Sequence, residues 1–324
     1  MTDLHVLVTG GAGFIGSHLV DGLLADPRVQ VTVLDKLTYA GSLENLAVHV
    51  DHPRFRFVRG DVTDPEVVVE LVGGADRVVH AAAESHVDRS IEGPGEFLRT
   101  NVLGTQVVLD ACRDRDRPLL LVSTDEIYGE GREGSTFHED DPPAPRSPYA
   151  ASKAAAELIA RAYQVTFGVP VTIVRGTNAY GPRQNPEKAI PVFVTAALDG
   201  RPLPVYDAGR QRREWLYVTD WIRACLVVLD RGEPGGTYNI GSGTELANLE
   251  LAQRICALAG ADPATIAFVD ARPGHDFRYG LDDARLRALG WTPEVPFDEG
   301  LARTVAWYRD HRAWVETMLA GVAG

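Results

Sequence analysis

The stretch Thr9-Gly-Gly-Ala-Gly-Phe-Ile-Gly-Ser17 decides the fold. It follows a short apolar run, Leu4–Thr9, which predicts a strand, and it opens a helical pattern that continues to about residue 25. Glycines at such a turn let the backbone approach a pyrophosphate, and the N–H groups and dipole of the helix N-terminus favour the negative charge. The spacing is G-x-x-G-x-x-G, and a glycine triplet alone is weak support for a dinucleotide site.

Asp35 strengthens this interpretation. It ends the next predicted strand, Val29–Asp35, 19 residues after Gly16, where a carboxylate can accept hydrogen bonds from the hydroxyls of an adenosine ribose. The same carboxylate repels a 2′-phosphate, so the sequence favours NAD over NADP, although the cation Lys36 beside it leaves NADP open.

Alternating strands and helices extend outward from this turn and predict βαβ units with a parallel sheet. Further strands are expected over Phe55–Arg59, 77–82, Leu119–Thr124 and 171–175, and long helices over 94–113 and Pro148–Phe167. Beyond Gly181 prolines cluster and the spacing becomes irregular. The predicted fold is α/β: a Rossmann-type doubly wound parallel sheet with a smaller mixed α/β C-terminal lobe. Residues 1–180 form the cofactor domain, residues 215–240 return to it, and residues 181–324 form the substrate lobe.

Composition limits the possible partners. The chain has 324 residues and a net charge of -13, which argues against binding nucleic acid or an anionic membrane. It has neither an apolar run of roughly 18–20 residues nor a basic leader. The three scattered cysteines, Cys112, Cys225 and Cys256, predict buried free thiols, with no disulfide and no metal site. Together these features indicate a cytoplasmic protein.

Tyr149 and Lys153 form a candidate catalytic pair, since residues four apart share one face of a helix. A tyrosine hydroxyl has a pKa of ~10 in water, and a neighbouring ammonium group together with the positive nicotinamide is expected to lower it. Tyr149 could then remove the proton of an alcohol while hydride leaves the same carbon. Lys153 could hold the nicotinamide ribose. Thr124, at the C-terminal end of its strand, could hydrogen-bond the reacting hydroxyl.

Asp125 and Glu126 follow Thr124 directly. Two adjacent carboxylates in a closed site do not both ionise easily, so one tends to remain protonated as an acid while the other acts as a base. The doublet therefore indicates acid–base chemistry after the oxidation.

With these motifs the chain resembles the extended short-chain dehydrogenase/reductases that act on nucleotide sugars, and among them the dTDP-glucose 4,6-dehydratases. The matching segments are TGGAGFIGS (9–17), DKLTYAG (35–41), AAESHVDRSI (82–91), STDEIYG (123–129), SPYAASK (147–153), PEK (186–188), REW (213–215) and RPGHD (272–276). They run in the family's order along nearly the whole chain.

The resemblance implies a redox-neutral dehydration with a tightly held NAD. Tyr149 would take the C4 hydroxyl proton, Glu126 the C5 proton, and Asp125 would protonate the leaving C6 hydroxyl. The implied cofactor-binding residues are Gly10, Gly13, Phe14, Ile15, Gly16, Asp35, Lys36, Thr38, Asp61, Val62, Ala81, Ala82, Thr100, Tyr149, Lys153 and Asn178. The implied substrate-binding residues are Ser85, Thr124, Asp125, Glu126, Tyr149, Asn178, Lys188, Tyr206, Arg213, Asn248 and His275. The resemblance also implies a homodimer, in which helices 94–113 and Pro148–Phe167 of both copies form a four-helix bundle.

Three departures from the family pattern lie near the substrate. Ala179 stands where the family usually has a second asparagine, Asn185 replaces an aromatic residue, and Asp207-Ala208-Gly209 replaces Gly-Asp-Gly. The nucleobase, thymine or uracil, therefore stays open. A 4-epimerase or decarboxylase on the same fold is the alternative enzyme, and a binding module that senses NAD without catalysis is the alternative without enzymatic activity. Asn248 could instead be a helix N-cap and His275 an ordinary loop residue.

Overall fold

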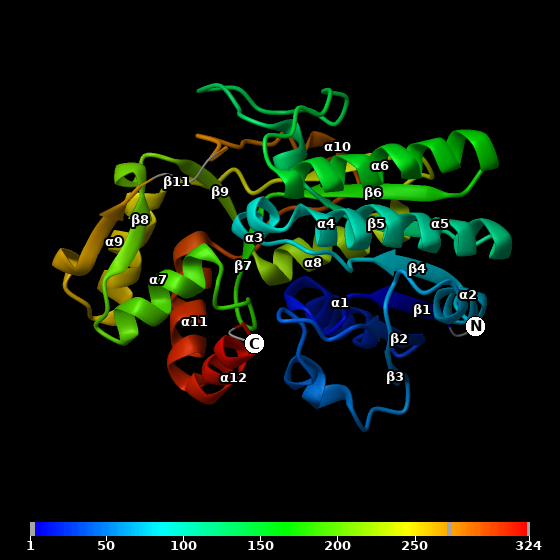
Figure 1. The fold of residues 1–324 in the computed structure, drawn as a ribbon, viewed down its shortest axis with the longest axis horizontal. Coiled ribbons are helices and arrows are strands. Elements are labelled where there is room, and N and C mark those ends of the chain that lie inside the picture. Colours follow the sequence, from blue (N-terminus) through cyan, green and yellow to red (C-terminus); the bar gives the residue numbers. More distant parts are fainter. Residues whose placement is uncertain (1–3, 271–273, 323–324) are drawn as a thin grey trace.

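A seven-stranded sheet runs through the centre of the computed structural model, which describes residues 4–270 and 274–322 (Figure 1). Its strand order is β10-β6-β5-β4-β1-β2-β3, and all neighbouring strands are parallel. The strands are β1 (Leu4–Thr9), β2 (Val29–Asp35), β3 (Phe55–Arg59), β4 (Arg77–His80), β5 (Leu119–Thr124), β6 (Val171–Gly176) and β10 (Thr237–Ile240). The order reverses between β1 and β4, and ligands of such sheets bind where that reversal opens a crevice.

Helices cover both faces of this sheet because successive strand residues point to opposite sides. Val6 and Val8 of β1 pack with α1 (Phe14–Leu24) and α8 (Val218–Arg231) in one buried cluster. Leu7 packs on the other face with α2 (Pro65–Gly73) and α5 (Gly104–Arg115), and α6 (Pro148–Phe167) joins the same cluster. Strands buried on both sides explain the nearly continuous apolar runs in the sequence.

The C-terminal region has a hydrophobic core of its own. It contains a three-stranded sheet of β7 (Asn178–Tyr180), β9 (Arg212–Tyr217) and β11 (Glu245–Ala247), and a strand pair of β8 (Leu203–Tyr206) and β12 (Ile266–Val269). Its main helices are α7 (Ala189–Leu198), α9 (Asn248–Ala259), α11 (Phe297–Asp310) and α12 (Arg312–Val322). The chain crosses back between the two parts, since α8 packs on the large sheet and β10 is one of its strands. A domain boundary at residue 180 stays a prediction.

The first half of the expected helix 94–113 is less regular than its pattern suggests. The structure has a short helix α4 (Pro94–Phe97), a π-helical turn η2 (Leu98–Leu103) and then α5. Asn101 in this turn exchanges hydrogen bonds with the backbone of Glu84 at 2.9 and 3.0 Å, and it donates to the Ser152 hydroxyl at 2.8 Å. π-helical turns of this kind are frequent at functional sites.

Other local expectations can be checked directly. β4 ends at His80 rather than at residue 82, so Ala81 and Ala82 lie in the following loop. Ser147 caps α6 by accepting a hydrogen bond from the Ala150 N–H at 3.1 Å, with Pro148 at the first helical position. The three cysteines are buried and free. Within residues 4–270 and 274–322, no helix is long and apolar enough to cross a bilayer.

Candidate active site

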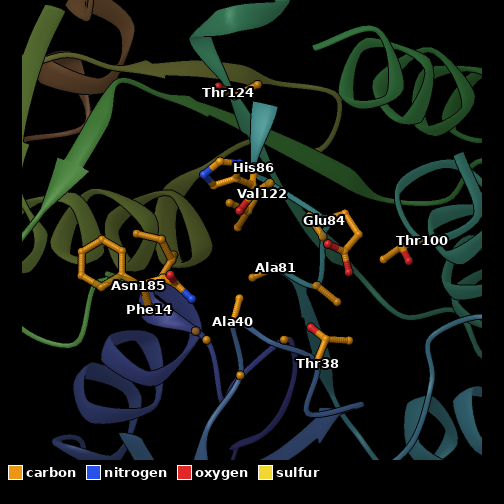
Figure 2. Close-up of a pocket in the computed structure, with 18 of the residues that line it drawn as sticks. Phe14, Thr38, Ala40, Ala81, Glu84, His86, Thr100, Val122, Thr124 and Asn185 are labelled. Carbon is orange, nitrogen blue, oxygen red and sulfur yellow. The ribbon is translucent and has the colours of Figure 1, made fainter. Parts of the chain in front are cut away.

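A cavity of about 310 Å³ lies where the C-terminal ends of β1, β2, β4, β5 and β6 meet. Figure 2 shows side chains from several segments that surround it, including Phe14 of α1, Thr38 after β2, Thr100 of η2 and Thr124 at the end of β5. Every residue that the sequence implied for the cofactor lines this cavity, and so do Thr124, Asp125, Glu126, Tyr149 and Lys153. The fold therefore brings the two predicted sets of residues together.

The three glycines of the turn differ in what a side chain at their position would contact. Gly10 has φ +72°, and a Cβ there would lie 2.6 Å from the backbone of Ala82. A Cβ on Gly16 would lie 2.0 Å from the Gly10 carbonyl oxygen. Gly13 has an extended backbone conformation, and a Cβ there would meet only the Gly10 carbonyl oxygen at 3.4 Å. Packing within the chain therefore requires Gly10 and Gly16, whereas Gly13 leaves open space at the start of α1, where no side chain caps the helix.

The Asp35 carboxylate is fixed at the other side of this turn. Oδ2 accepts a hydrogen bond from the Ala12 N–H at 2.9 Å, and Oδ1 accepts one from the Leu37 N–H at 2.8 Å. Burial raises the pKa of Asp35, while these two backbone N–H groups lower it. Lys36 Nζ lies 2.7 Å from Asp61 Oδ2, so its charge is engaged by a carboxylate of the same cavity. This pairing weakens the case for a 2′-phosphate next to Lys36.

The cavity fits a dinucleotide in three respects. The uncapped N-terminus of α1 offers N–H groups beside a space that Gly13 keeps open. A partly buried carboxylate, Asp35, stands at the end of β2. Asn178 Nδ2, deep in the same cavity, is buried with no hydrogen-bond partner among the described residues, which suits a ligand that supplies an acceptor.

Tyr149 and Lys153 lie one turn apart on α6, and both are almost fully buried. Lys153 Nζ donates to the Val122 carbonyl oxygen at 2.7 Å. Burial raises the pKa of Tyr149, the charge of Glu126 raises it further, and a hydrogen bond with Thr124 lowers it. In the protein alone the loss of hydration therefore outweighs the other groups and raises this pKa, and the lowering expected from the ammonium together with the nicotinamide stays a prediction.

Asp125 and Glu126 stand in the 3₁₀ turn η3 (Asp125–Tyr128) that follows β5. Thr124 caps this turn, and its hydroxyl accepts a hydrogen bond from the Glu126 N–H at 3.3 Å. Burial, and after it the charge of Glu126, raises the pKa of Asp125 to about 8. Asp125 is therefore protonated at neutral pH, as a general acid must be.

The residues implied for the substrate fall into two groups. Ser85, Asn178 and Lys188 line the cavity, and Lys188 Nζ donates to the Ser85 carbonyl oxygen at 2.6 Å. Tyr206, Arg213, Asn248 and His275 lie outside its lining, in the C-terminal region.

Arg213 is buried and lies near enough for its charge to lower the pKa of Asp125. It donates to the backbone carbonyls of Arg212, Asp276 and Phe277, and it stacks 4.6 Å from the centroid of the Tyr279 ring. The rings of Tyr206 and His275 pack edge to face with centroids 5.7 Å apart. Asn248 is the first residue of α9 and Ala247 is the N-cap, so the N-cap alternative for Asn248 is wrong. Arg272 and Pro273 of the RPGHD segment lie outside the described residues.

Other residues that sequence reasoning did not assign also line the cavity, among them Tyr39, Glu84, His86, Gln184, Asn185 and Glu187 (Figure 2 labels Glu84, His86 and Asn185). Arg89 links two of them, since it lies 4.0 Å above the Tyr39 ring and 2.9 Å from Glu187 Oε1. Tyr39, Glu84 and His86 belong to motif segments and could have been found from that position alone. Asn185 stood out only as a departure from the family pattern and Glu187 only as part of PEK (186–188), whereas nothing in the sequence marks Gln184, which reaches the site only through folding.

Comparisons with known proteins agree with this geometry. The model of the NAD dependent epimerase/dehydratase family matches residues 6–241. A dTDP-glucose 4,6-dehydratase of Streptomyces niveus is 51% identical over 97% of this chain and 96% of its own. The low-salt glycan biosynthesis protein Agl12 of Haloferax volcanii is 52% identical over 94% of this chain and 98% of its own.

A solved structure extends the likeness to three dimensions. DesIV, a dTDP-glucose 4,6-dehydratase from Streptomyces venezuelae solved with NAD and TYD bound, superposes with a TM-score of 0.95 at 49% identity. The match covers 97% of this chain and 100% of that one. Because the family model spans most of the chain and these relatives match nearly all of it, the chain belongs to the NAD dependent epimerase/dehydratase family.

Proposed function

We propose that this chain is an NAD-dependent nucleotide-sugar 4,6-dehydratase that converts dTDP-glucose to dTDP-4-keto-6-deoxyglucose and water. The observation that carries the proposal is the buried Asp125, which the protein holds protonated beside the carboxylate Glu126. Both residues face the cavity that also contains Tyr149 and Lys153. A site for oxidation alone does not need this second acid–base pair.

The roles of the side chains follow from their positions. Tyr149 accepts the proton of the C4 hydroxyl, with Thr124 hydrogen-bonded beside it. Bound NAD supplies the oxidising power, taking hydride from C4 and returning it to C6. The ketone at C4 acidifies the C5 proton, which Glu126 removes, and Asp125 protonates the C6 hydroxyl so that it leaves as water. Glu126 then returns a proton to C5, and exchange with solvent removes the proton on Tyr149 and restores the one given by Asp125, so the atoms and the oxidation state balance.

The choice of substrate rests on the relatives. The Streptomyces niveus relative and DesIV are both dTDP-glucose 4,6-dehydratases at about half identity over nearly full length. The departures at Ala179, Asn185 and residues 207–209 bear on the sugar or base rather than on the reacting groups. UDP-glucose is therefore the alternative substrate, and a 4-epimerase or decarboxylase is the alternative activity.

One incubation separates these functions. The pure enzyme is given dTDP-glucose or UDP-glucose in D₂O without added NAD, and the product mass is followed. Loss of one water with one deuterium gained at C5 supports dehydration with a retained cofactor. Inversion at C4 with unchanged mass would replace the proposal with epimerisation, and loss of CO₂ from a uronic acid analogue would replace it with decarboxylation.

We also propose a homodimer formed through α6 and the region 94–115. Several apolar side chains on these elements face solvent, including Leu98, Leu103, Leu158 and Val165. An exposed apolar surface of this kind is typical of a protein–protein interface.

Three buried free thiols support the proposed location in a reducing compartment, the cytoplasm.

A further inference from the structure

Three buried charged side chains lie next to the reacting groups. Lys153 is 5% exposed, and Glu157 and Arg175 are each 2% exposed. Buried charges are costly unless each has a partner. The proposed chemistry uses Lys153 and leaves the other two without a function.

Glu157 and Arg175 form a closely bonded pair. Arg175 Nε lies 3.2 and 3.1 Å from the two carboxylate oxygens of Glu157, and Nη2 lies 2.7 Å from Oε2. Nη1 of Arg175 donates to the Tyr128 hydroxyl at 2.7 Å and to the Glu139 carbonyl oxygen at 2.9 Å. The arginine is thus held from several sides, and it holds the Glu157 carboxylate in one position.

Glu157 also lies on the same face of α6 as Lys153, because four residues separate them. Burial lowers the pKa of Lys153 to about 8, and the negative charge of Glu157 opposes this effect. At neutral pH Lys153 therefore keeps its charge by a margin of only about one pH unit, and Glu157 is the group that favours the charge.

Other groups near Lys153 do not replace this effect. His80 of β4 is buried, and burial, followed by the charge of Lys153, lowers its pKa to about 3, so it is neutral. Asp125 is protonated below about pH 8. Other charged or titratable groups near Lys153 and Glu157 are Tyr149 on α6, Glu126 and Tyr128 in η3, and the cation Arg175 on β6.

We infer that Glu157 is a positioning residue of the reaction: held by Arg175, it keeps Lys153 as an ammonium ion beside Tyr149. The inference rests on the proposed function, with Lys153 taken as the cation that, together with the nicotinamide, favours the Tyr149 phenolate. It adds a residue outside the lining of the cavity, since neither Glu157 nor Arg175 lines it.

The decisive experiment compares pH profiles of Glu157→Gln and wild type, both loaded with NAD. Without the carboxylate, Lys153 loses its proton at lower pH, so the high-pH limb of dTDP-glucose turnover moves down by about one pH unit. Phenolate absorbance, taken as the difference from Tyr149→Phe, shows Tyr149 ionising at higher pH. A uniform loss of rate with both profiles unmoved would make Glu157 merely structural and overturn the inference.

Matched variants keep the experiment interpretable. Glu157→Asp retains the charge, and both profiles stay near those of the wild type. Asp220→Asn removes a buried carboxylate that binds the Glu294 and Val295 N–H groups at 2.9 and 2.7 Å, and it lowers stability without moving either profile. If Glu157→Gln misfolds because Arg175 is left uncompensated, the double variant Glu157→Gln/Arg175→Met replaces it, with the same expected direction.

The two readouts also separate this inference from the proposed function. A wild type that does not dehydrate dTDP-glucose contradicts the proposed function, and the phenolate titration still tests Glu157. An active wild type whose Glu157→Gln variant shows unshifted profiles contradicts only the role of Glu157.

Discussion

At the scale of single residues, Asp125 and Glu126 separate elimination from oxidation. Asp125→Asn and Glu126→Gln leave Tyr149 and Lys153 in place, so both variants are expected to form enzyme-bound NADH with dTDP-glucose. Dehydration is expected to fall by roughly 10²–10⁴-fold, the usual contribution of a general acid or base. Absorbance of NADH and product mass, measured on the same samples, check this. Normal dehydration by both variants would show that the assigned roles are wrong.

The raised pKa of Asp125 also predicts a pH dependence of stability. Its folded pKa of about 8 lies above the ordinary value of 3.8 for an aspartate, so folding favours the protonated form. The stability that this group contributes is present below the unfolded pKa and is lost as pH rises through the folded pKa. Asp125→Asn cannot ionise, so its Tm should exceed that of the wild type by an amount that grows from about pH 4 to about pH 8 and then stays constant. A Tm difference that does not change with pH would contradict the buried, protonated state.

At the scale of elements, the turn between β1 and α1 contains glycines that packing requires and one that it does not. Gly10→Ala places a Cβ 2.6 Å from the Ala82 backbone at a positive φ, so it should destabilise the fold. Gly13→Ala meets only ordinary contact at 3.4 Å, so its Tm should stay near that of the wild type. Its affinity for NAD should nevertheless fall by about tenfold or more, because the methyl group fills the space beside the helix N-terminus. Calorimetry with and without NAD measures both effects, and tight NAD binding by Gly13→Ala would place the pyrophosphate elsewhere.

At the scale of the whole molecule, exposed apolar residues on α6 test the proposed dimer. Leu158 is 57% exposed and Val165 is 86% exposed, and both follow the active-site residues on the same helix. Leu158→Glu/Val165→Glu should convert a dimer to a monomer, because a charged group buried at an interface is costly. Light scattering after size exclusion gives the mass. Val48→Glu, at an equally exposed position on the 3₁₀ helix η1 (Leu43–His49), is the control and should leave the mass unchanged. A wild type that is monomeric throughout would contradict the dimer.

Sequence patterns predicted the central sheet well because each of its strands is a short apolar run bounded by a turn. They predicted β5, β2 and α6 with their observed ends. They missed the π-helical turn η2, since its cause is the side chain of Asn101 turning toward Glu84 and Ser152, which come from other parts of the chain. They also missed Gln184, which lines the cavity from a segment without regular structure, and they gave Asn185 and Glu187 no role in the site.

The sequence by itself determined the βαβ order, the glycine turn with Asp35, and the identity of the reacting groups. These depend on residues close together in the chain, where spacing decides which side chains share a helix face or a strand end. Only the tertiary structure decided the charge states. Asp125 becomes an acid through burial and the charges of Glu126 and Glu214, and Lys153 depends on Glu157, which Arg175 of β6 holds in place. Burial and charge–charge interactions across the fold set these pKa values, and neither is a property of local sequence.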